Sequence, residues 1–244
     1  MRGCIGILTL PHTLAIGTSH IMKSYVDWFE DHGIRVLPIP FDTTDPSFYL
    51  DRIHGLFLPG TDKGYDVIHP LFMQTLQWFV DYSMRPSVYF PIWGTCFGME
   101  ALALLGGIKL SLHPSEGPSP LTVVGRSRMM QHVSSGIQVV QNHRYGISLQ
   151  AFQRLKSFFR ITGTCVDDTG VPYVAAMEAR AYPLYAVQFH PERTASPFLS
   201  FLHSELQRCS PAPRRHVIPA VGTSAKKHKC VHYEGMKKEW CYFF

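Results

Sequence analysis

Short runs of apolar residues alternate along the first half of the chain with segments in which apolar residues recur every three or four positions. Apolar runs are typical of buried strands, and the longer period is typical of amphipathic helices. This alternation predicts βαβ units, and therefore a parallel sheet with helices on both faces. The elements predicted here are strand 4–10, helix 18–33, strands 34–39 and 55–60, helix 67–84, strand 87–93 and helix 97–107.

The second half has a more β-like pattern. Two apolar segments, 121–125 and 137–141, are separated by polar, Ser and Gly residues, which predicts a hairpin or meander. The remaining predicted elements are helix 149–159, two strands within 159–178, strand 184–192 and helix 196–208. From Cys209 the chain is rich in Pro and basic residues without a period, which predicts an irregular or partly disordered extension over 209–244 after one domain, 1–208.

The composition agrees with this α/β class, a three-layer open and mostly parallel sheet with a small antiparallel section. A chain of 244 residues with 45% hydrophobic content can bury one sizeable core. No apolar run reaches the roughly 18 residues of a membrane-spanning helix, and the run near the N-terminus is too short for a clear signal peptide. The net charge is +5, and the basic residues are dispersed except near the end, which argues against a dedicated nucleic-acid binder.

Six cysteines are too few for a disulfide scaffold, and their spacing fits no strong zinc pattern, so no metal is expected. One of them, Cys96, stands between Gly94 and Gly98, after a predicted strand and before a predicted helix. Such a strand-to-helix turn can hold a nucleophile above the edge of a sheet, and the helix N-terminus favours the thiolate. A buried structural cysteine in a glycine-rich turn remains the alternative from this segment alone.

The sequence His190-Pro191-Glu192 follows a later predicted strand and supplies partners for a thiol. Proline disfavours a helical backbone at the residue before it, and residues two apart in an extended chain point to the same side. Glu192 can therefore accept a hydrogen bond from one ring nitrogen of His190, which leaves the other nitrogen to act as a base. Since ligands bind at the carboxyl ends of strands in open α/β sheets, we predict a triad of Cys96, His190 and Glu192.

A third motif, Leu58-Pro59-Gly60, ends another predicted strand at the same edge of the sheet. The backbone N–H groups of Gly60 and Phe97 are predicted to form an oxyanion hole for a tetrahedral intermediate. An ordinary Pro-Gly turn explains this motif equally well.

Together, GTCFG, FHPE and LPG resemble the class I glutamine amidotransferases, over roughly Cys4 to Phe198. Within that group the chain resembles the gamma-glutamyl hydrolases, because Glu100 stands where glutamine-using enzymes usually carry Gln and because the segment NHRYGISLQAFQ is similar. The resemblance implies that Cys96 is the nucleophile, that His190 is the general base and then the acid, and that Glu192 orients His190. It also implies that His143 and Glu100 line the substrate pocket, where Glu100 would suit an α-ammonium group.

The resemblance further implies hydrolysis of γ-glutamyl bonds in folate poly-γ-glutamates or related peptides through a thioester, without a cofactor. Arg144 and Arg193 would attract such polyanionic small molecules. A homodimer and a lysosomal, vacuolar or secreted location are also implied, whereas nucleic acid and membrane partners are not. Two alternatives stay open: a glutamine amidotransferase component that releases ammonia from glutamine, and an inactive relative that binds γ-glutamyl compounds.

Overall fold

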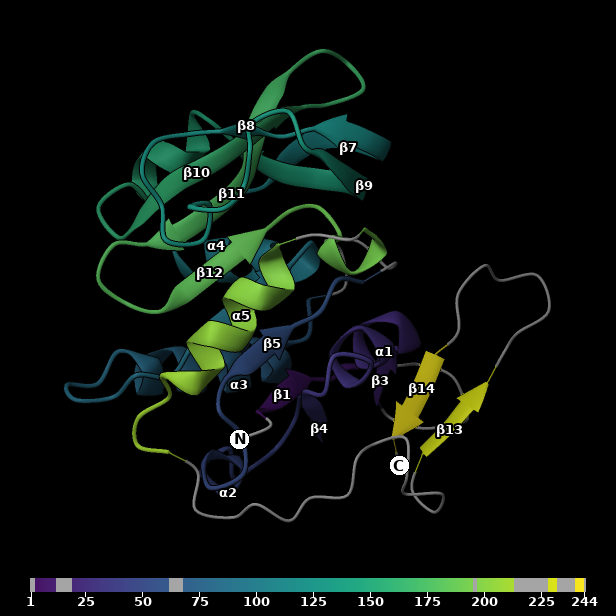
Figure 1. Ribbon diagram of the computed structural model, residues 1–244, viewed down its shortest axis with the longest axis vertical. Coiled ribbons are helices and arrows are strands. Elements are labelled where there is room, and N and C mark those ends of the chain that lie inside the picture. The colour runs from purple at the N-terminus through teal and green to yellow at the C-terminus, as the bar shows by residue number, and fades with distance from the viewer. Residues whose placement is uncertain are drawn as a thin grey trace. The chain divides into compact units, whose positions relative to one another are not determined.

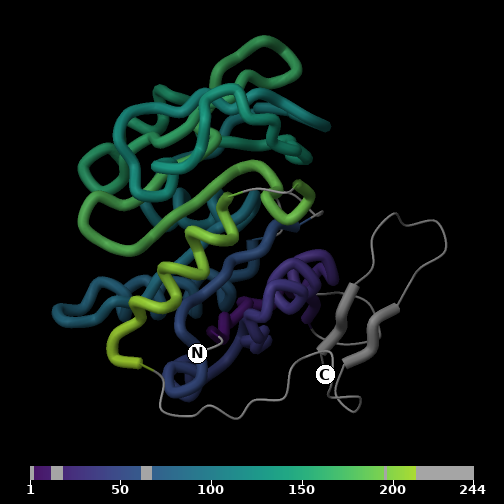
Figure 2. The backbone as a smooth tube through the Cα atoms, viewed as in Figure 1, coloured from purple at the N-terminus to yellow at the C-terminus, as the bar shows by residue number. Residues whose placement is uncertain are grey.

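The computed structural model describes residues 3–11, 19–61, 68–194 and 197–212, together with the backbone of 228–231 and 240–243. The chain forms two compact units, whose path is traced in Figure 2. Unit 1 comprises Met1–Pro59, Ile68–Pro91 and His203–Phe244, and unit 2 comprises Gly60–Val67 and Ile92–Leu202. No helix in the described part of the chain is long and apolar enough to cross a membrane.

Unit 1 contains a parallel sheet in which β1 (Cys4–Leu8) pairs with β4 (Arg35–Ile39) on one side and with β5 (Leu56–Leu58) on the other. All five residues of β1 and all three of β5 are buried. Continuous burial of this kind is typical of parallel strands that are covered on both faces. The apolar runs near the N-terminus therefore form the parallel strands that their pattern predicted.

The helices of unit 1 are α1 (Lys23–Glu30), α2 (Ser47–Leu50) and α3 (Pro70–Ser83). The buried face of α1 packs on β5, because the rings of Tyr25 and Phe29 each lie 5.1 Å from that of Phe57. Helix α3 begins with Pro70, three residues after the predicted start at residue 67, and the ring of His69 accepts a hydrogen bond from the N–H of Leu71.

A second sheet in unit 1 is antiparallel, with the order β13 (His228–Val231), β14 (Trp240–Phe243), β3 (Ser19–Met22) and β2 (Leu10–Pro11). The predicted start of helix 18–33 is therefore wrong, because residues 19–22 pair as a strand before α1 begins. Long-range pairing with β14 and β2 overrides the local helical pattern. Apart from β13, β14 and residues 209–212, the predicted extension 209–244 lies outside the described residues and stays a prediction.

Unit 2 is rich in strands (Figure 1). The parallel pair β6 (Ile92–Thr95) and β12 (Leu184–Val187) is continued by the antiparallel strands β11 (Pro172–Ala179), β10 (Phe159–Val166) and β8 (Thr122–Val123). The long strand β9 (Gln138–Ser148) pairs with β7 (Ser111–Pro120) and with β11. Helix α4 (Phe97–Leu105) follows β6, and α5 (Phe198–Gln207) runs from unit 2 into unit 1.

Two predicted elements of unit 2 are wrong. The segments 121–125 and 137–141 do not form a hairpin ladder, since β8 pairs with β10 and β9 pairs with β7 and β11. Strand β7 contains three prolines and a glycine, so its sequence gives no strand signal. The predicted helix 149–159 contains only a short 3-10 turn, η2 (Ala151–Arg154). The apolar side chains of Phe152, in this turn, and of Leu155, directly after it, are buried.

Candidate active site

Cys96 occupies a sharp turn between β6 and α4. Its backbone has φ 53° and ψ −111°, a region that residues with a side chain rarely adopt. Its carbonyl accepts hydrogen bonds from the N–H groups of Met99 and Glu100, which closes the first turn of α4 directly behind the thiol. Backbone strain held by surrounding structure is typical of functional turns, and the positive end of α4 lies at the sulfur.

The two flanking glycines explain how the chain can make this turn. A Cβ atom at Gly94 would lie 2.7 Å from the backbone carbon and oxygen of Gly98, and 2.9 Å from the nitrogen of Met99. These are backbone atoms, so no side-chain movement would relieve the clash. The Gly-x-Cys-x-Gly spacing therefore lets β6 and the first turn of α4 approach closely enough to hold Cys96 between them.

His190 and Glu192 form a buried pair after β12. Nδ1 of His190 lies 2.8 Å from Oε1 of Glu192, and their side chains are 2% and 0% exposed. A carboxylate oxygen accepts, so the ring carries its hydrogen on Nδ1, and Nε2 holds the lone pair of the neutral ring. His190 has φ −104° and ψ 89°, and Pro191 begins the 3-10 turn η3 (Pro191–Arg193). The predicted contact between His190 and Glu192 is present, but this turn makes it and not an extended chain.

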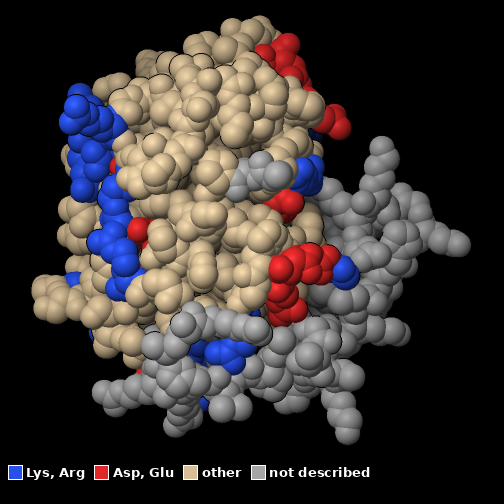
Figure 3. All heavy atoms as spheres, viewed as in Figure 1, with Lys and Arg blue, Asp and Glu red and all other residues tan. Residues whose placement is uncertain are grey.

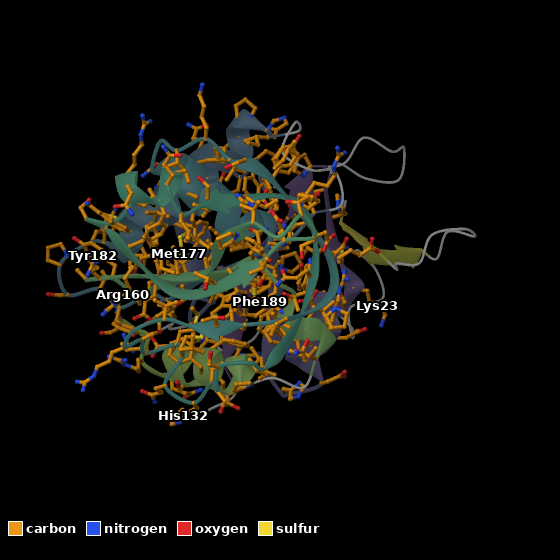
Figure 4. All side chains as sticks on the ribbon, turned by 90° about the horizontal axis from the view of Figure 1, so that it is seen from above. Lys23, His132, Arg160, Met177, Tyr182 and Phe189 are labelled. Carbon is orange, nitrogen blue, oxygen red and sulfur yellow. The ribbon has the colours of Figure 1, made fainter. Side chains whose placement is uncertain are left out.

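Pairing between β6 and β12 brings the elbow and the histidine to one edge of the sheet. Thr95 lies opposite Val187 in the parallel register, and the N–H of Cys96 donates to the carbonyl of Val187 at 2.8 Å. His190 follows three residues later. Between them, Phe189 anchors the segment in the interior by packing on Phe198, with ring centroids 5.2 Å apart (Figure 4).

Strand β9 contacts both groups. The carbonyl of Val140 accepts from the N–H of His190 at 2.9 Å, and the carbonyl of Asn142 lies 3.9 Å from the sulfur of Cys96, within reach of a thiol donor. Carbonyls two residues apart in a strand point to the same side, about 7 Å from each other. Cys96 and His190 therefore both contact β9, at residues that are two apart in the strand.

Glu100 lies one turn into α4 and is 4% exposed. Burial raises the pKa of its carboxyl group to about 7, although a hydrogen bond from the side chain of Gln188 opposes this effect. The Nε2 atom of Gln188 donates to Oε1 of Glu100 at 2.9 Å. Gln188 was not singled out from the sequence, although it stands two residues before His190 and is itself fully buried.

His143 projects from β9 next to this site. Its Nδ1 lies 3.0 Å from the carbonyl oxygen of Tyr145, and its Nε2 lies 3.2 Å from the hydroxyl of Tyr173. Burial lowers the pKa of its ring to about 4, and positive charge on His190 lowers it further. His143 is therefore a neutral ring at ordinary pH, close enough to His190 for their charges to interact.

Comparison with known proteins identifies the family. Residues 21–208 match the family model described as glutamine amidotransferase class-I. A gamma-glutamyl hydrolase of Mus musculus is 31% identical, over 98% of this chain and 80% of its own length. The chain belongs to the gamma-glutamyl hydrolases. Gamma-glutamyl hydrolase B of Dictyostelium discoideum is 30% identical over 78% of this chain, which spans only 62% of that relative's length.

The fold comparison agrees with that family. The crystal structure of a Thermoplasma acidophilum protein described as a component of GMP synthase covers 86% of this chain and 95% of its own, with a TM-score of 0.65 at 20% identity. The predicted α/β class and the resemblance to gamma-glutamyl hydrolases within the class-I glutamine amidotransferases are therefore confirmed.

The two predicted oxyanion donors lie in the same compact unit as the thiol. Phe97 is the first residue of α4 and is 5% exposed, and Gly60 is buried two residues after the end of β5. Among the residues that the structure describes, no group of three or more His, Cys, Asp or Glu side chains is arranged so that it could hold a metal ion.

Proposed function

We propose that this chain hydrolyses γ-glutamyl amide bonds through a thioester on Cys96. One observation carries the proposal. A strained cysteine at the start of a helix and a buried His–Glu pair follow two neighbouring parallel strands, and each contacts a backbone carbonyl of β9. The relatives named above are gamma-glutamyl hydrolases, and the same chemistry is assigned here to named groups of this chain.

In the first half of the reaction, Nε2 of His190 removes the proton of the Cys96 thiol. The thiolate attacks the γ-carbonyl carbon, and a carbon–sulfur bond forms while the carbonyl electrons move to oxygen. When the tetrahedral intermediate collapses, the carbon–nitrogen bond breaks and the His190 imidazolium gives its proton to the leaving amine. Glu192 holds the ring in the tautomer that this transfer requires and stabilises its positive charge.

In the second half, water attacks the thioester. His190 takes a proton from the water, the carbon–sulfur bond breaks, and the proton passes to the sulfur, so that a glutamate carboxyl group is released and the enzyme is restored. We assign the backbone N–H groups of Phe97 and Gly60 to the negative oxygen of both intermediates. One such donor is worth roughly 10²- to 10³-fold in rate in other hydrolases.

Folate poly-γ-glutamates and other γ-glutamyl peptides are the proposed substrates. They are polyanions, and two cations flank the site: Arg144 is exposed on β9, and Nε of Arg193 lies 3.7 Å from Oε1 of Glu192. Lys and Arg side chains also gather along one edge of the face drawn in Figure 3. The exposed residues Arg154, Lys156 and Arg180 belong to unit 2, where Nε of Arg180 donates to the carbonyl of Lys156.

The test incubates the full chain with a folate polyglutamate and, separately, with free glutamine, followed by mass analysis. Shortened folates are expected, and ammonia from glutamine without shortened folates would favour an amidotransferase instead. Cys96→Ala should abolish cleavage. Cys4→Ala is the matched control, because Cys4 is a buried thiol in unit 1 whose burial raises its pKa to about 11. Cleavage by Cys96→Ala would refute the nucleophile.

The family resemblance also supports a homodimer as a proposal about assembly. Light scattering on the purified chain would give twice the mass of the 244-residue chain if the proposal is right, and a single-chain mass if it is wrong.

A further inference from the structure

Unit 2 holds a second cluster of buried polar side chains next to the proposed catalytic groups. It comprises His113 of β7, Asp167 after β10 and Tyr173 of β11, which are 3%, 6% and 0% exposed. The proposed reaction uses none of them. Polar groups are costly to bury unless they are hydrogen-bonded. A buried polar cluster beside His143 is therefore a candidate for a functional contribution.

The cluster is built on a clamp between His113 and Asp167. Nδ1 of His113 lies 2.8 Å from Oδ2 of Asp167, and the ring therefore donates to the carboxylate. The other oxygen, Oδ1, accepts from the N–H and the hydroxyl of Thr169 and from the N–H of Val171, at 2.7 to 2.9 Å. Although burial opposes ionisation, these hydrogen bonds hold the pKa of Asp167 below its ordinary value.

His113 reaches Asp167 from an irregularity in the β7–β9 ladder. The register shifts between Leu112 and Ser115, so that His113 and Pro114 stand in the bulge. The carbonyl of Pro114 accepts from the N–H of Asp168 at 2.9 Å, which is a second tie between the bulge and the β10–β11 turn. Bulges of this kind redirect a side chain, and they are frequent beside active sites.

Tyr173 lies between two imidazole rings. Its ring centroid is 5.5 Å from that of His113 and 5.2 Å from that of His143, which meets it edge-on at 69°. Burial raises the pKa of its hydroxyl far above the ordinary value, so this group keeps its proton. The hydroxyl oxygen lies 3.2 Å from Nε2 of His143, and it also hydrogen-bonds with the side chains of Ser115 and Cys165. Because the hydroxyl keeps its proton, it can donate to the lone pair of Nε2 when the His143 ring is neutral.

The hydrogen bonds of His143 then define its tautomer. The carbonyl of Tyr145 accepts from Nδ1–H, and Nε2 accepts from Tyr173. Oε1 of Gln141 is also placed 3.2 Å from Nε2, but a side-chain amide can turn to present its NH2 group, which is the side that suits a lone pair. The backbone hydrogen bonds to Tyr145 and His113 favour a charged ring, but burial outweighs them. The ring is therefore neutral with its hydrogen on Nδ1, and Nε2 is left to accept from Tyr173.

We propose that Tyr173, held by the His113–Asp167 clamp, is a positioning residue that keeps His143 neutral and so keeps a second positive charge away from His190. The inference rests on the proposed function, in which His190 becomes an imidazolium. The titratable groups that face His143 or its partner Tyr173 are listed by element: His113 from β7, Cys165 from β10, Asp167 after β10, Tyr173 from β11, and His190 after β12.

The consequence for the reaction follows from repulsion between like charges. A protonated His143 would disfavour the protonated His190 that must form during amine release. Loss of the Tyr173 hydroxyl removes a donor that favours neutral His143, so the pKa of His143 should rise. Below that new pKa the variant should be slow, and above it the variant should resemble the wild type.

The first experiment observes the His143 ring by NMR and needs no substrate. In the wild type we expect the Nδ1–H tautomer and a titration near pH 4. In Tyr173→Phe the midpoint should rise by about one pH unit or more, which is a tenfold change in the proton equilibrium. An Nε2–H tautomer in the wild type, or an unchanged midpoint in Tyr173→Phe, would overturn the proposal.

The second experiment measures kcat and KM for γ-glutamyl cleavage from pH 5 to pH 8. Tyr173→Phe should lose about twofold or more in kcat at the acid end, with a smaller change in KM, and should recover as the pH rises. The control is Tyr182→Phe, which removes a half-buried hydroxyl from a ring stacked on Phe158 (Figure 4).

A uniform loss at all pH values, or the same acid loss in the control, would contradict the positioning role. Absence of cleavage by the wild type would instead count against the proposed function, and the NMR result would still decide whether Tyr173 sets the state of His143.

Discussion

Two histidine–carboxylate pairs in unit 2 have the same central geometry and different surroundings. His190 and His113 each place Nδ1 2.8 Å from a carboxylate oxygen, of Glu192 and Asp167 respectively. Both pairs are almost wholly buried. Around His190 lie the elbow of Cys96 and the carbonyls of β9, whereas the ring of His113 packs on Tyr173.

The comparison teaches that an imidazole held by a carboxylate is not by itself a catalyst. What the ring can do depends on the group that faces it, which we propose is the strained thiol of Cys96 in the first case and which is the ring of Tyr173 in the second. The same bond can therefore serve proton transfer at one position and structural clamping at another.

Replacing His190 should have the largest effect. His190→Asn should lower kcat by about 10³-fold or more, because both proton transfers lose their carrier. The measurement is single-turnover cleavage of a γ-glutamyl substrate, with His132→Asn, an exposed histidine labelled in Figure 4, as control. Normal turnover in His190→Asn would remove the distinction between the two pairs.

Replacing the carboxylate of the first pair should have the next largest effect. Glu192→Gln should lower kcat by about 10²-fold or more, since an amide no longer stabilises the imidazolium and can hold the ring in the wrong tautomer. Alkylation of Cys96 by iodoacetamide, followed across pH, reports the same loss without substrate. If both rates match the wild type, Glu192 is not the orienting group.

The difference between the pairs also decides what the sequence could reveal. His190 and Glu192 are two residues apart around a proline, so their contact lies within one short turn of the chain. His113 and Asp167 are 54 residues apart and meet through a bulge in β7, a strand that contains three prolines. A pattern of short period cannot encode a contact of that kind, and for this reason the clamp was missed.

The same reasoning separates the elements that were predicted from those that were not. The apolar runs of β1 and β5 and the period of α3 predicted those elements, because burial of each one is continuous or regular. The start of α1 and the pairing of β8 were wrong, since strands distant in sequence decided both. The Gly-x-Cys-x-Gly elbow was predictable because a side chain at Gly94 would clash with the nearby backbone of Gly98, so the sequence itself shows where the turn can form.

A third buried acid sharpens the contrast, because Glu100 contacts an amide rather than an imidazole. Burial raises its pKa from 4.5 to about 7, so folding favours the protonated form. That contribution to the free energy of unfolding is complete below pH 4.5, declines as the pH rises, and is lost above pH 7. Glu100→Gln removes the dependence.

Urea denaturation of Glu100→Gln should therefore give a smaller decline between pH 5 and pH 8 than the wild type shows. The difference in this decline is about 3 kcal/mol at most. Glu116→Gln, an exposed acid of β7, serves as control and should follow the wild type. Parallel pH profiles for Glu100→Gln and the wild type would show that Glu100 is ionised in the folded chain.

Breaking the second pair should have the smallest effect of the four, and the effect should be on stability. Asp167→Asn weakens the hydrogen bond from His113 and those from Thr169 and Val171, which should cost about 2 kcal/mol of unfolding free energy at pH 7. The pKa of Asp167 is lowered in the fold, so its stabilising contribution is present above pH 3.8 and is lost as the pH falls further.

The difference between Asp167→Asn and the wild type should therefore shrink in acid, and Asp168→Asn, its exposed neighbour, should show no such difference. Turnover at pH 8 should fall less than about tenfold, because the clamp acts on His143 only through Tyr173. If Asp167→Asn instead lost as much kcat as Glu192→Gln with no loss of stability, the second pair would belong to the reaction itself, and the contrast between the two histidines would have to be abandoned.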